Sequence, residues 1–151
     1  MADNTYIPKY FELYELLPPE LYVGDLYTSE IARQRAFASY FDIKLLITID
    51  KVRDIIGKPL ICNTWFQDGN RRYCGFRTEN CSVGTRLSAH KEGKAADLIC
   101  RDYSAEQMRQ IIFEHKDLLP YPIRIEDKVS WLHIDTREFK GKGKIYLFLC
   151  A

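Results

Sequence analysis

Two histidines and one aspartate have the types and spacing needed to hold a metal ion. His90 and Asp97 lie seven residues apart in the segment SAHKEGKAAD, and His133 lies in the segment WLHID. Small residues between His90 and Asp97 permit a tight turn that brings both side chains to one point, while a distant strand supplies the third ligand. Zinc suits such nitrogen and oxygen ligands, and a catalytic zinc typically has three protein ligands and a water. A metal held there would lower the pKa of its water and polarise a carbonyl group.

The same segment carries a family resemblance. SAHKEGKAAD matches the pattern S-x-H-x-x-G-x-A-x-D at all five fixed positions. On this motif the chain resembles the D-Ala-D-Ala metallopeptidases, which include zinc D,D-carboxypeptidases and phage endolysins and share their zinc site with the signalling domain of hedgehog proteins. WLHIDTR resembles a strand of the phage-associated carboxypeptidase branch, and PLICNTWFQDG resembles the strand and turn before the motif. The resemblance covers about residues 59–137 and implies that His90, Asp97 and His133 bind Zn²⁺.

The resemblance also suggests where a general base should be found. The dipeptidase branch has a catalytic glutamate three residues before the last zinc histidine, where this chain has Ser130. The carboxypeptidase and hedgehog branches have a histidine two residues before it, where this chain has Trp131. The hedgehog-like branch has a glutamate six residues before it, where this chain has Asp127 beside Glu126. We therefore expect Asp127 to be the general base, with Glu126 as the second candidate.

Substrate contacts are expected from an arginine and a tryptophan. The family uses an arginine near the site to bind a peptide carboxylate or carbonyl, and four arginines lie in residues 67–87. Among these we favour Arg77, in the GFR segment. An arginine suits this role because a guanidinium binds a carboxylate through two parallel hydrogen bonds. Trp131 shares a strand face with His133, since side chains alternate along a strand. It either lines the pocket or belongs to the core.

Two further residues are candidates for contacts behind the metal ligands. Asp135 also shares the face of His133, and it either orients a ligand or pairs with Arg137. Ser88 either hydrogen-bonds a zinc ligand or shapes the turn before His90.

The elements that must position these residues indicate an α+β domain. We expect helices in an N-terminal part of about residues 1–57 and the zinc site in a sheet part of about residues 58–151, both within a single hedgehog/D,D-peptidase-like domain. Helices should pack on one face of a small antiparallel sheet, and the turn-rich segment REFKGKGK should join the last two strands as a hairpin. The expected helices cover residues 6–17, 29–41, 50–56 and 104–115, and the expected strands cover residues 59–65, 97–100, 123–126, 131–135 and 145–149.

Composition excludes several classes of partner. The chain has 151 residues, 46% of them hydrophobic, and a formal net charge of +1 at pH 7, which is typical of one globular domain. Near-neutral charge argues against a nucleic-acid partner, and no apolar run approaches the roughly 18 residues of a membrane span. The first residues show no secretory signal peptide. We therefore expect a monomer without nucleic-acid or membrane partners, cytoplasmic until release.

Together these observations predict a zinc-dependent peptidase that hydrolyses peptidoglycan stem peptides, as a D,D-carboxypeptidase or a phage endolysin-type endopeptidase. Such an enzyme would be phage- or prophage-encoded and would act on the cell wall. The alternative is a non-catalytic zinc-containing domain that binds cell wall or a protein.

Overall fold

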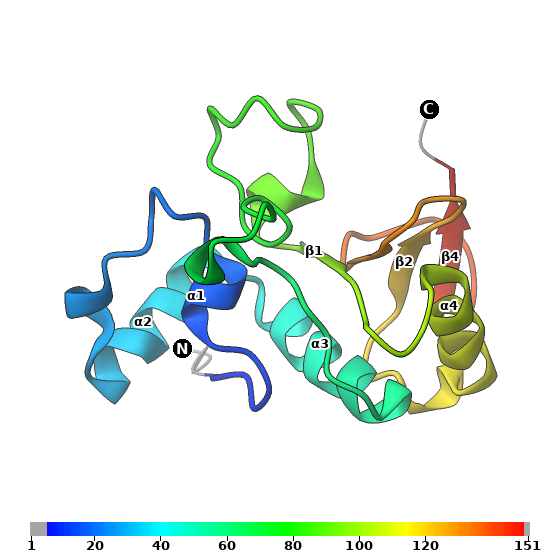
Figure 1. Cartoon of the computed structure of the whole chain (residues 1–151). Helices are drawn as coiled ribbons and strands as arrows, with labels where there is room; N and C mark the ends of the chain where they lie inside the picture. The colour runs from blue at the N-terminus through cyan, green and yellow to red at the C-terminus, as the bar shows by residue number, and fades with distance from the viewer. Residues whose placement is uncertain (1–5, 150–151) are drawn as a thin grey trace, which may run out of the picture.

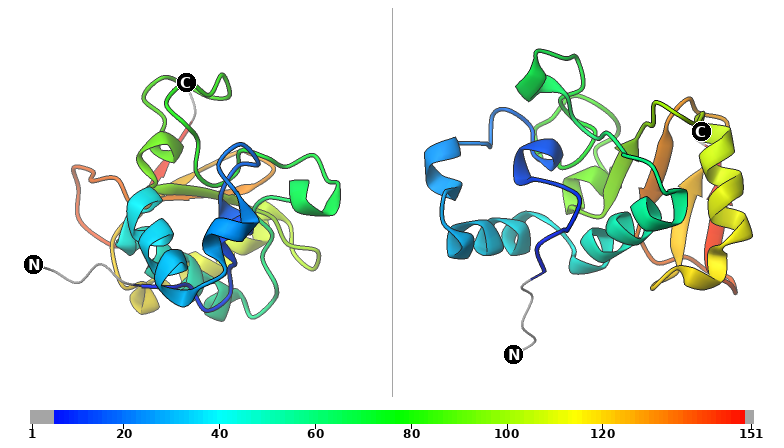
Figure 2. Two further views of the ribbon diagram at one scale, coloured as in Figure 1. Left: turned by 90° about the vertical axis from the view of Figure 1, so that its left-hand side faces the viewer. Right: turned by 60° about the horizontal axis from the view of Figure 1, so that its bottom comes forward.

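The computed structural model describes residues 6–149, in which helices are followed by a four-stranded sheet (Figure 1). The helices are α1 (Leu13–Leu16), α2 (Glu30–Tyr40), α3 (Ile43–Ile56) and α4 (Ala105–Glu114), and the strands are β1 (Ala95–Leu98), β2 (Ile123–Glu126), β3 (Leu132–Asp135) and β4 (Ile145–Phe148). Both views that show the molecule lengthwise place α1 and α2 at one end, the sheet and α4 at the other, and α3 between them (Figures 1 and 2). In the described part of the chain, no helix combines the length and the apolar character that crossing a membrane requires.

The helix ends follow local capping rules. The Asp42 side chain accepts the N–H of Lys44 and begins α3, and Gly57 ends this helix in the left-handed conformation with φ 74°. Ser104 and Gln107 form the capping box that the sequence predicts at the start of α4.

The prediction of a helix over residues 6–17 is mostly wrong, because only α1 is helical within this range. The backbone N–H groups of Lys9 and Tyr10 instead donate to the carboxylate of Asp50 in α3. These N–H groups are therefore bound to another element, and the chain before α1 is held against α3 through Asp50.

The sheet has the strand order β1-β3-β2-β4, with β2 and β4 parallel and the other two pairs antiparallel. The expected hairpin of β3 and β4, and with it the purely antiparallel sheet, is wrong. Both edges of β3 are occupied by β1 and β2, and β4 pairs with the outer edge of β2. The strand expected over residues 59–65 is reduced to an isolated bridge between Ile61 and Ile99.

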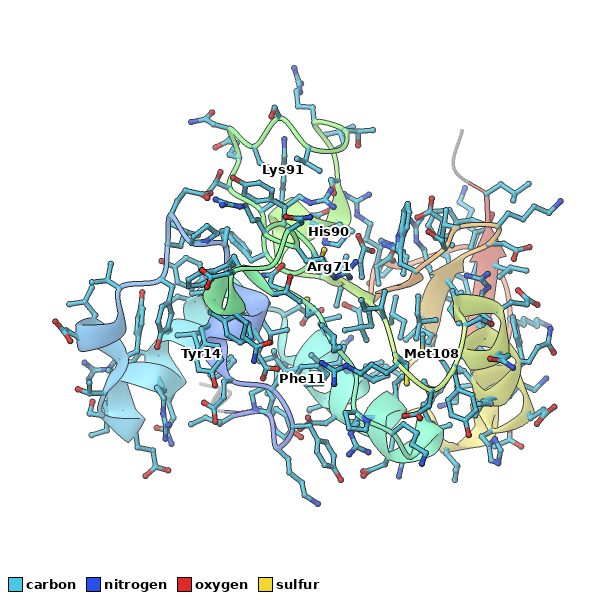
Figure 3. The ribbon with its side chains drawn as sticks, viewed as in Figure 1. Phe11, Tyr14, Arg71, His90, Lys91 and Met108 are labelled. Carbon is cyan, nitrogen blue, oxygen red and sulfur yellow. The ribbon has the colours of Figure 1, made fainter. Side chains whose placement is uncertain are left out.

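The two faces of the sheet differ in chemistry. One face is apolar and packs against α3 and α4. Its core cluster includes residues from both halves of the chain, among them Phe11 and Met108, which Figure 3 labels. Because side chains alternate along a strand, the opposite face collects the polar residues of the same strands. Those residues form the site described next.

Candidate metal centre

Short-range structure explains how His90 and Asp97 meet. A 3₁₀ turn, η3 (Ala89–Glu92), begins at Ser88, whose Oγ accepts the N–H of His90, and ends at Gly93 with φ 68°. The chain then enters β1, where Asp97 lies directly opposite His133 of β3. The expected tight turn is present, and an antiparallel strand pair supplies the third residue. The Ser88 contact supports the turn-shaping role for this side chain.

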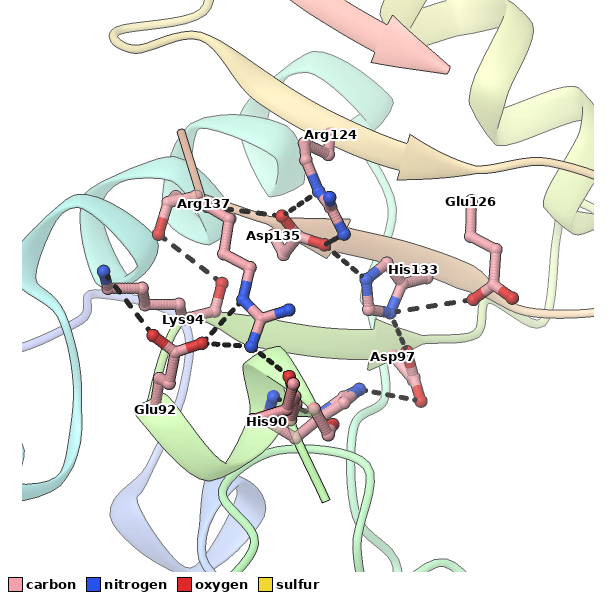
Figure 4. A network of polar contacts seen from close by, with 12 residues as sticks. His90, Glu92, Lys94, Asp97, Arg124, Glu126, His133, Asp135 and Arg137 are labelled. Atoms are coloured by element: carbon pink, nitrogen blue, oxygen red, sulfur yellow. Dashed lines mark hydrogen bonds and ion pairs between the residues drawn. The ribbon is translucent and has the colours of Figure 1, made fainter. Parts of the chain in front are cut away.

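His90, Asp97 and His133 are all buried, and each offers one ligand atom within 4.8 Å of those of the other two. His90 Nε2 lies 3.3 Å from Asp97 Oδ2, and His133 Nδ1 lies 2.8 Å from Asp97 Oδ1. Figure 4 shows both rings directed at this carboxylate. Residues from a 3₁₀ turn and two strands thus converge on one point, as the sequence predicts.

The far nitrogen of each imidazole is bound to an acceptor. His90 Nδ1 lies 2.8 Å from the carbonyl oxygen of Gly75, and His133 Nε2 lies 2.8 Å from Asp135 Oδ2. A carbonyl oxygen can only accept, so His90 donates from Nδ1 to Gly75, and its Nε2 lies toward Asp97. Metal-bound histidines are generally oriented in this way by a carboxylate or carbonyl behind the ring. The donor set and its outer contacts therefore fit a three-ligand zinc site.

Charge at the centre favours a cation. Burial lowers the pKa of His133, but hydrogen bonds to Asp135 and Asp97 outweigh burial and raise it to about 9. Burial raises the pKa of Asp97, but hydrogen bonds to His133 and His90 outweigh it and hold this pKa well below its usual range. Two carboxylates on either side of one imidazole stabilise positive charge between them, which a proton or a metal ion can supply.

Asp135 is fully buried and held from several sides. Arg124 of β2 donates to it through Nε (2.8 Å) and a terminal nitrogen (3.2 Å), and the backbone N–H of Arg137 donates to it at 3.2 Å. The guanidinium of Arg137 turns instead to Glu92. This geometry supports the role of orienting a ligand. Arg124 is a site residue beyond those predicted from the sequence, although its two-residue spacing from Glu126 on one strand indicates a shared face.

The adjacent carboxylates of Glu126 and Asp127 lie on opposite sides of the sheet. Glu126 is buried, and its Oε2 lies 4.0 Å from His133 Nδ1 (Figure 4). Asp127 instead lies 3.7 Å from the guanidinium of Arg109 on α4. The structure therefore does not bring Asp127, the first choice as general base, to the centre. Strand alternation explains the difference, since α4 covers the other face of the sheet.

The centre forms part of a cleft of about 450 Å³. Arg77 lines it with a terminal nitrogen 3.5 Å from Asp97 Oδ2, and donates from Nε to the Tyr73 carbonyl. Trp131 also lines the cleft, and its buried indole N–H has no acceptor among residues 6–149. Both expected substrate contacts therefore lie in the cleft. Further lining residues include Leu87, Ser88, Arg124, Glu126, Arg137 and Phe148.

Arg71 supports the centre through hydrogen bonds to two backbone carbonyl groups. Its Nε donates to the Cys62 carbonyl (2.7 Å) and a terminal nitrogen donates to the Asp97 carbonyl (2.8 Å). Figure 3 shows Arg71 near His90 in the middle of the molecule. These bonds join β1 to the segment around Cys62. Only the folded structure reveals this, because no spacing links Arg71 to a backbone carbonyl.

Comparison of the chain with protein-family models, with curated proteins and with solved structures found no significant match.

Proposed function

We propose that this protein is a zinc-dependent peptidase that hydrolyses peptidoglycan stem peptides, as a D,D-carboxypeptidase or an endolysin-type endopeptidase with a hedgehog/D,D-peptidase-like fold. The observation that carries the proposal is the convergence of His90, Asp97 and His133 at the wall of a cleft, with both far imidazole nitrogens bound to acceptors. The substrate class is supported by the resemblance of the SAHKEGKAAD motif to that family.

His90, Asp97 and His133 are the residues that would hold the zinc ion. When bound there, zinc supplies Lewis-acid chemistry, because it polarises a peptide carbonyl and acidifies a coordinated water. The donor set of two imidazoles and one carboxylate matches the ligands that catalytic zinc prefers.

Glu126 is the carboxylate best placed to handle the proton. Its distance of 4.0 Å from His133 Nδ1 puts it beside the point on which the ligands converge. In hydrolysis it accepts a proton as water adds to the carbonyl carbon, and it returns this proton to the amine nitrogen as the C–N bond breaks.

Arg77 and Trp131 are the groups that would hold the substrate. The Arg77 guanidinium provides paired N–H donors for a peptide carboxylate or carbonyl at the cleft wall. The Trp131 side chain lines the cleft beside the centre and offers aromatic surface for substrate contact.

Metal analysis and a hydrolysis assay together test the proposal. The purified protein should contain about one zinc per chain and should release D-Ala or a peptide from purified muropeptides. Failure to bind zinc, even after zinc is added to metal-free protein, would rule the proposal out. Stable zinc binding without cleavage of any muropeptide would favour the non-catalytic binding domain instead.

A further inference from the structure

A second cavity, of about 290 Å³, adjoins the cleft. It lies between the start of α3, the residues before β2 and the segment that follows β3, and its walls include Lys44, Tyr121 and Phe139. Arg137 lines both the cleft and this cavity. The cleft and the cavity are therefore neighbours, with the Arg137 side chain in the wall of both.

Lys44 gives this cavity a cation that is free to bind a ligand. Its ammonium lies 5.5 Å from the centre of the Tyr121 ring, and within residues 6–149 it forms no ion pair. The other lining cation, Arg137, is already paired with Glu92. Lys44 and Glu138, the one acidic residue of the wall, are both exposed to water, and no ion pair joins them. A carboxylate flanked by a short apolar stem fits this combination of an ammonium and aromatic rings.

The distance between the cleft and the cavity suits an extended peptide. Arg137 follows His133 by four residues in chain that is extended through β3, so the two are separated by roughly 13 Å at about 3.3 Å per residue. A substrate with its scissile bond at the ligand cluster would reach the second cavity with its third or fourth residue, since an extended peptide advances at a similar rate.

We propose that the cavity beyond Arg137 is a subsite for an acidic residue of the substrate, three or four residues from the scissile bond, and that Lys44 pairs with its carboxylate. This inference rests on the proposed function. In a stem peptide, the matching group is the α-carboxylate of the γ-linked D-glutamate, which cell walls contain in both free and amidated forms.

Calorimetric binding of the matching product tetrapeptide, L-Ala-γ-D-Glu-L-Lys-D-Ala, tests the subsite without any cleavage step. The probe is compared with its carboxamide analogue on the full-length protein as purified, with and without a chelator. We expect the carboxylate form to bind about fivefold more tightly, the size of one partly exposed charge pair, and less so at high salt. In Lys44→Gln this preference should disappear.

Lys51→Gln is the matched control, because Lys51 lies two turns further along α3 and outside the cavity. It should keep the preference for the carboxylate form. Equal affinity of the wild type for both peptides, no binding of either, or an undiminished preference in Lys44→Gln would each overturn the inference. The proposed function would fail separately, through absence of zinc or of hydrolysis, because the tetrapeptide already lacks the terminal D-Ala.

Discussion

At the scale of single residues, His133 has the most constrained surroundings in the centre. One of its nitrogens faces Asp97 and the other faces Asp135, which Arg124 holds with two hydrogen bonds. A carboxylate behind a ligand histidine fixes the ring and makes it a stronger donor to the metal. Asp135 should therefore contribute to metal affinity although it is not a ligand.

Substituting Asp135→Asn should weaken zinc affinity about 10–100-fold. The asparagine loses the negative charge, and its amide NH₂ faces either the Arg124 guanidinium or the His133 N–H, both of which are donors. Competition with a chromophoric chelator measures the effect. Asp127→Asn is the control, since Asp127 faces Arg109 on the other side of the sheet, and equal losses in both variants would contradict the assignment.

The two adjacent carboxylates make a second comparison possible. Glu126→Gln should lower kcat by about 10²–10⁴ while leaving bound zinc in place, because it removes only the proton acceptor. Asp127→Asn should stay near the wild-type rate. Steady-state hydrolysis of a muropeptide, with metal content measured on the same samples, separates the two. If Asp127→Asn were the inactive variant, the assignment from the strand face would be wrong.

At the scale of elements, the turn between His90 and Asp97 packs against the junction of α2 and α3. Gly93 adopts φ 68°, and its carbonyl accepts the N–H of Asp42. A Cβ at Gly93 would lie 2.0 Å from the Tyr40 carbonyl oxygen, which no rotation of a side chain can relieve. The spacing of His90 and Asp97, two of the candidate ligands, therefore depends on contact with a helix junction about fifty residues earlier.

Gly93→Ala should cost about 3 kcal/mol or more of unfolding free energy and should also weaken zinc binding, because the turn must shift. Gly57→Ala is a matched control, since Gly57 has φ 74° but no atom within 4 Å of an added Cβ. It should cost only the left-handed strain, about 1–2 kcal/mol, and should bind zinc normally. Urea denaturation and chelator competition provide both readouts. Similar losses in the two variants would show that backbone conformation alone is responsible.

Local signals in the sequence predicted much of the site but less of the sheet. Helix caps such as Ser104 and Gly57 depend on neighbouring residues, and so does the turn between His90 and Asp97. The spacing of residues in the sequence therefore predicts them. The pairing of β4 with β2 depends on how the strands are arranged in the folded sheet, which no local spacing records. The side of the sheet that Asp127 faces depends on strand register in the same way, and the Arg71 and Arg124 contacts depend on tertiary proximity.

At the scale of the whole molecule, the core joins both halves of the chain, so the charges at the centre are linked to global stability. The pKa of His133 is raised to about 9 in the folded protein, against about 6.5 in an unfolded chain. A raised pKa contributes stability that is complete below the unfolded value and is lost as the pH rises through the folded value.

Metal-free protein should therefore lose unfolding free energy between about pH 6.5 and pH 9. Zinc affinity should rise over the same range, because zinc and the proton compete for Nδ1 of His133. Urea denaturation with a chelator, repeated across this range, measures the first effect. His133→Gln should abolish this pH dependence, and a dependence that survives the substitution would have to come from other groups.

The position of β4 has a consequence for how the chain is made. β4 is synthesised after all three ligand residues, yet it covers the outer edge of β2 and places Phe148 against His133 and Arg124. Until β4 has left the ribosome, the backbone edge of β2 is unpaired, and edges of this kind promote association between nascent chains. The cleft around the candidate centre is thus completed late in synthesis, and the segment of residues 136–144 must emerge before the sheet can close.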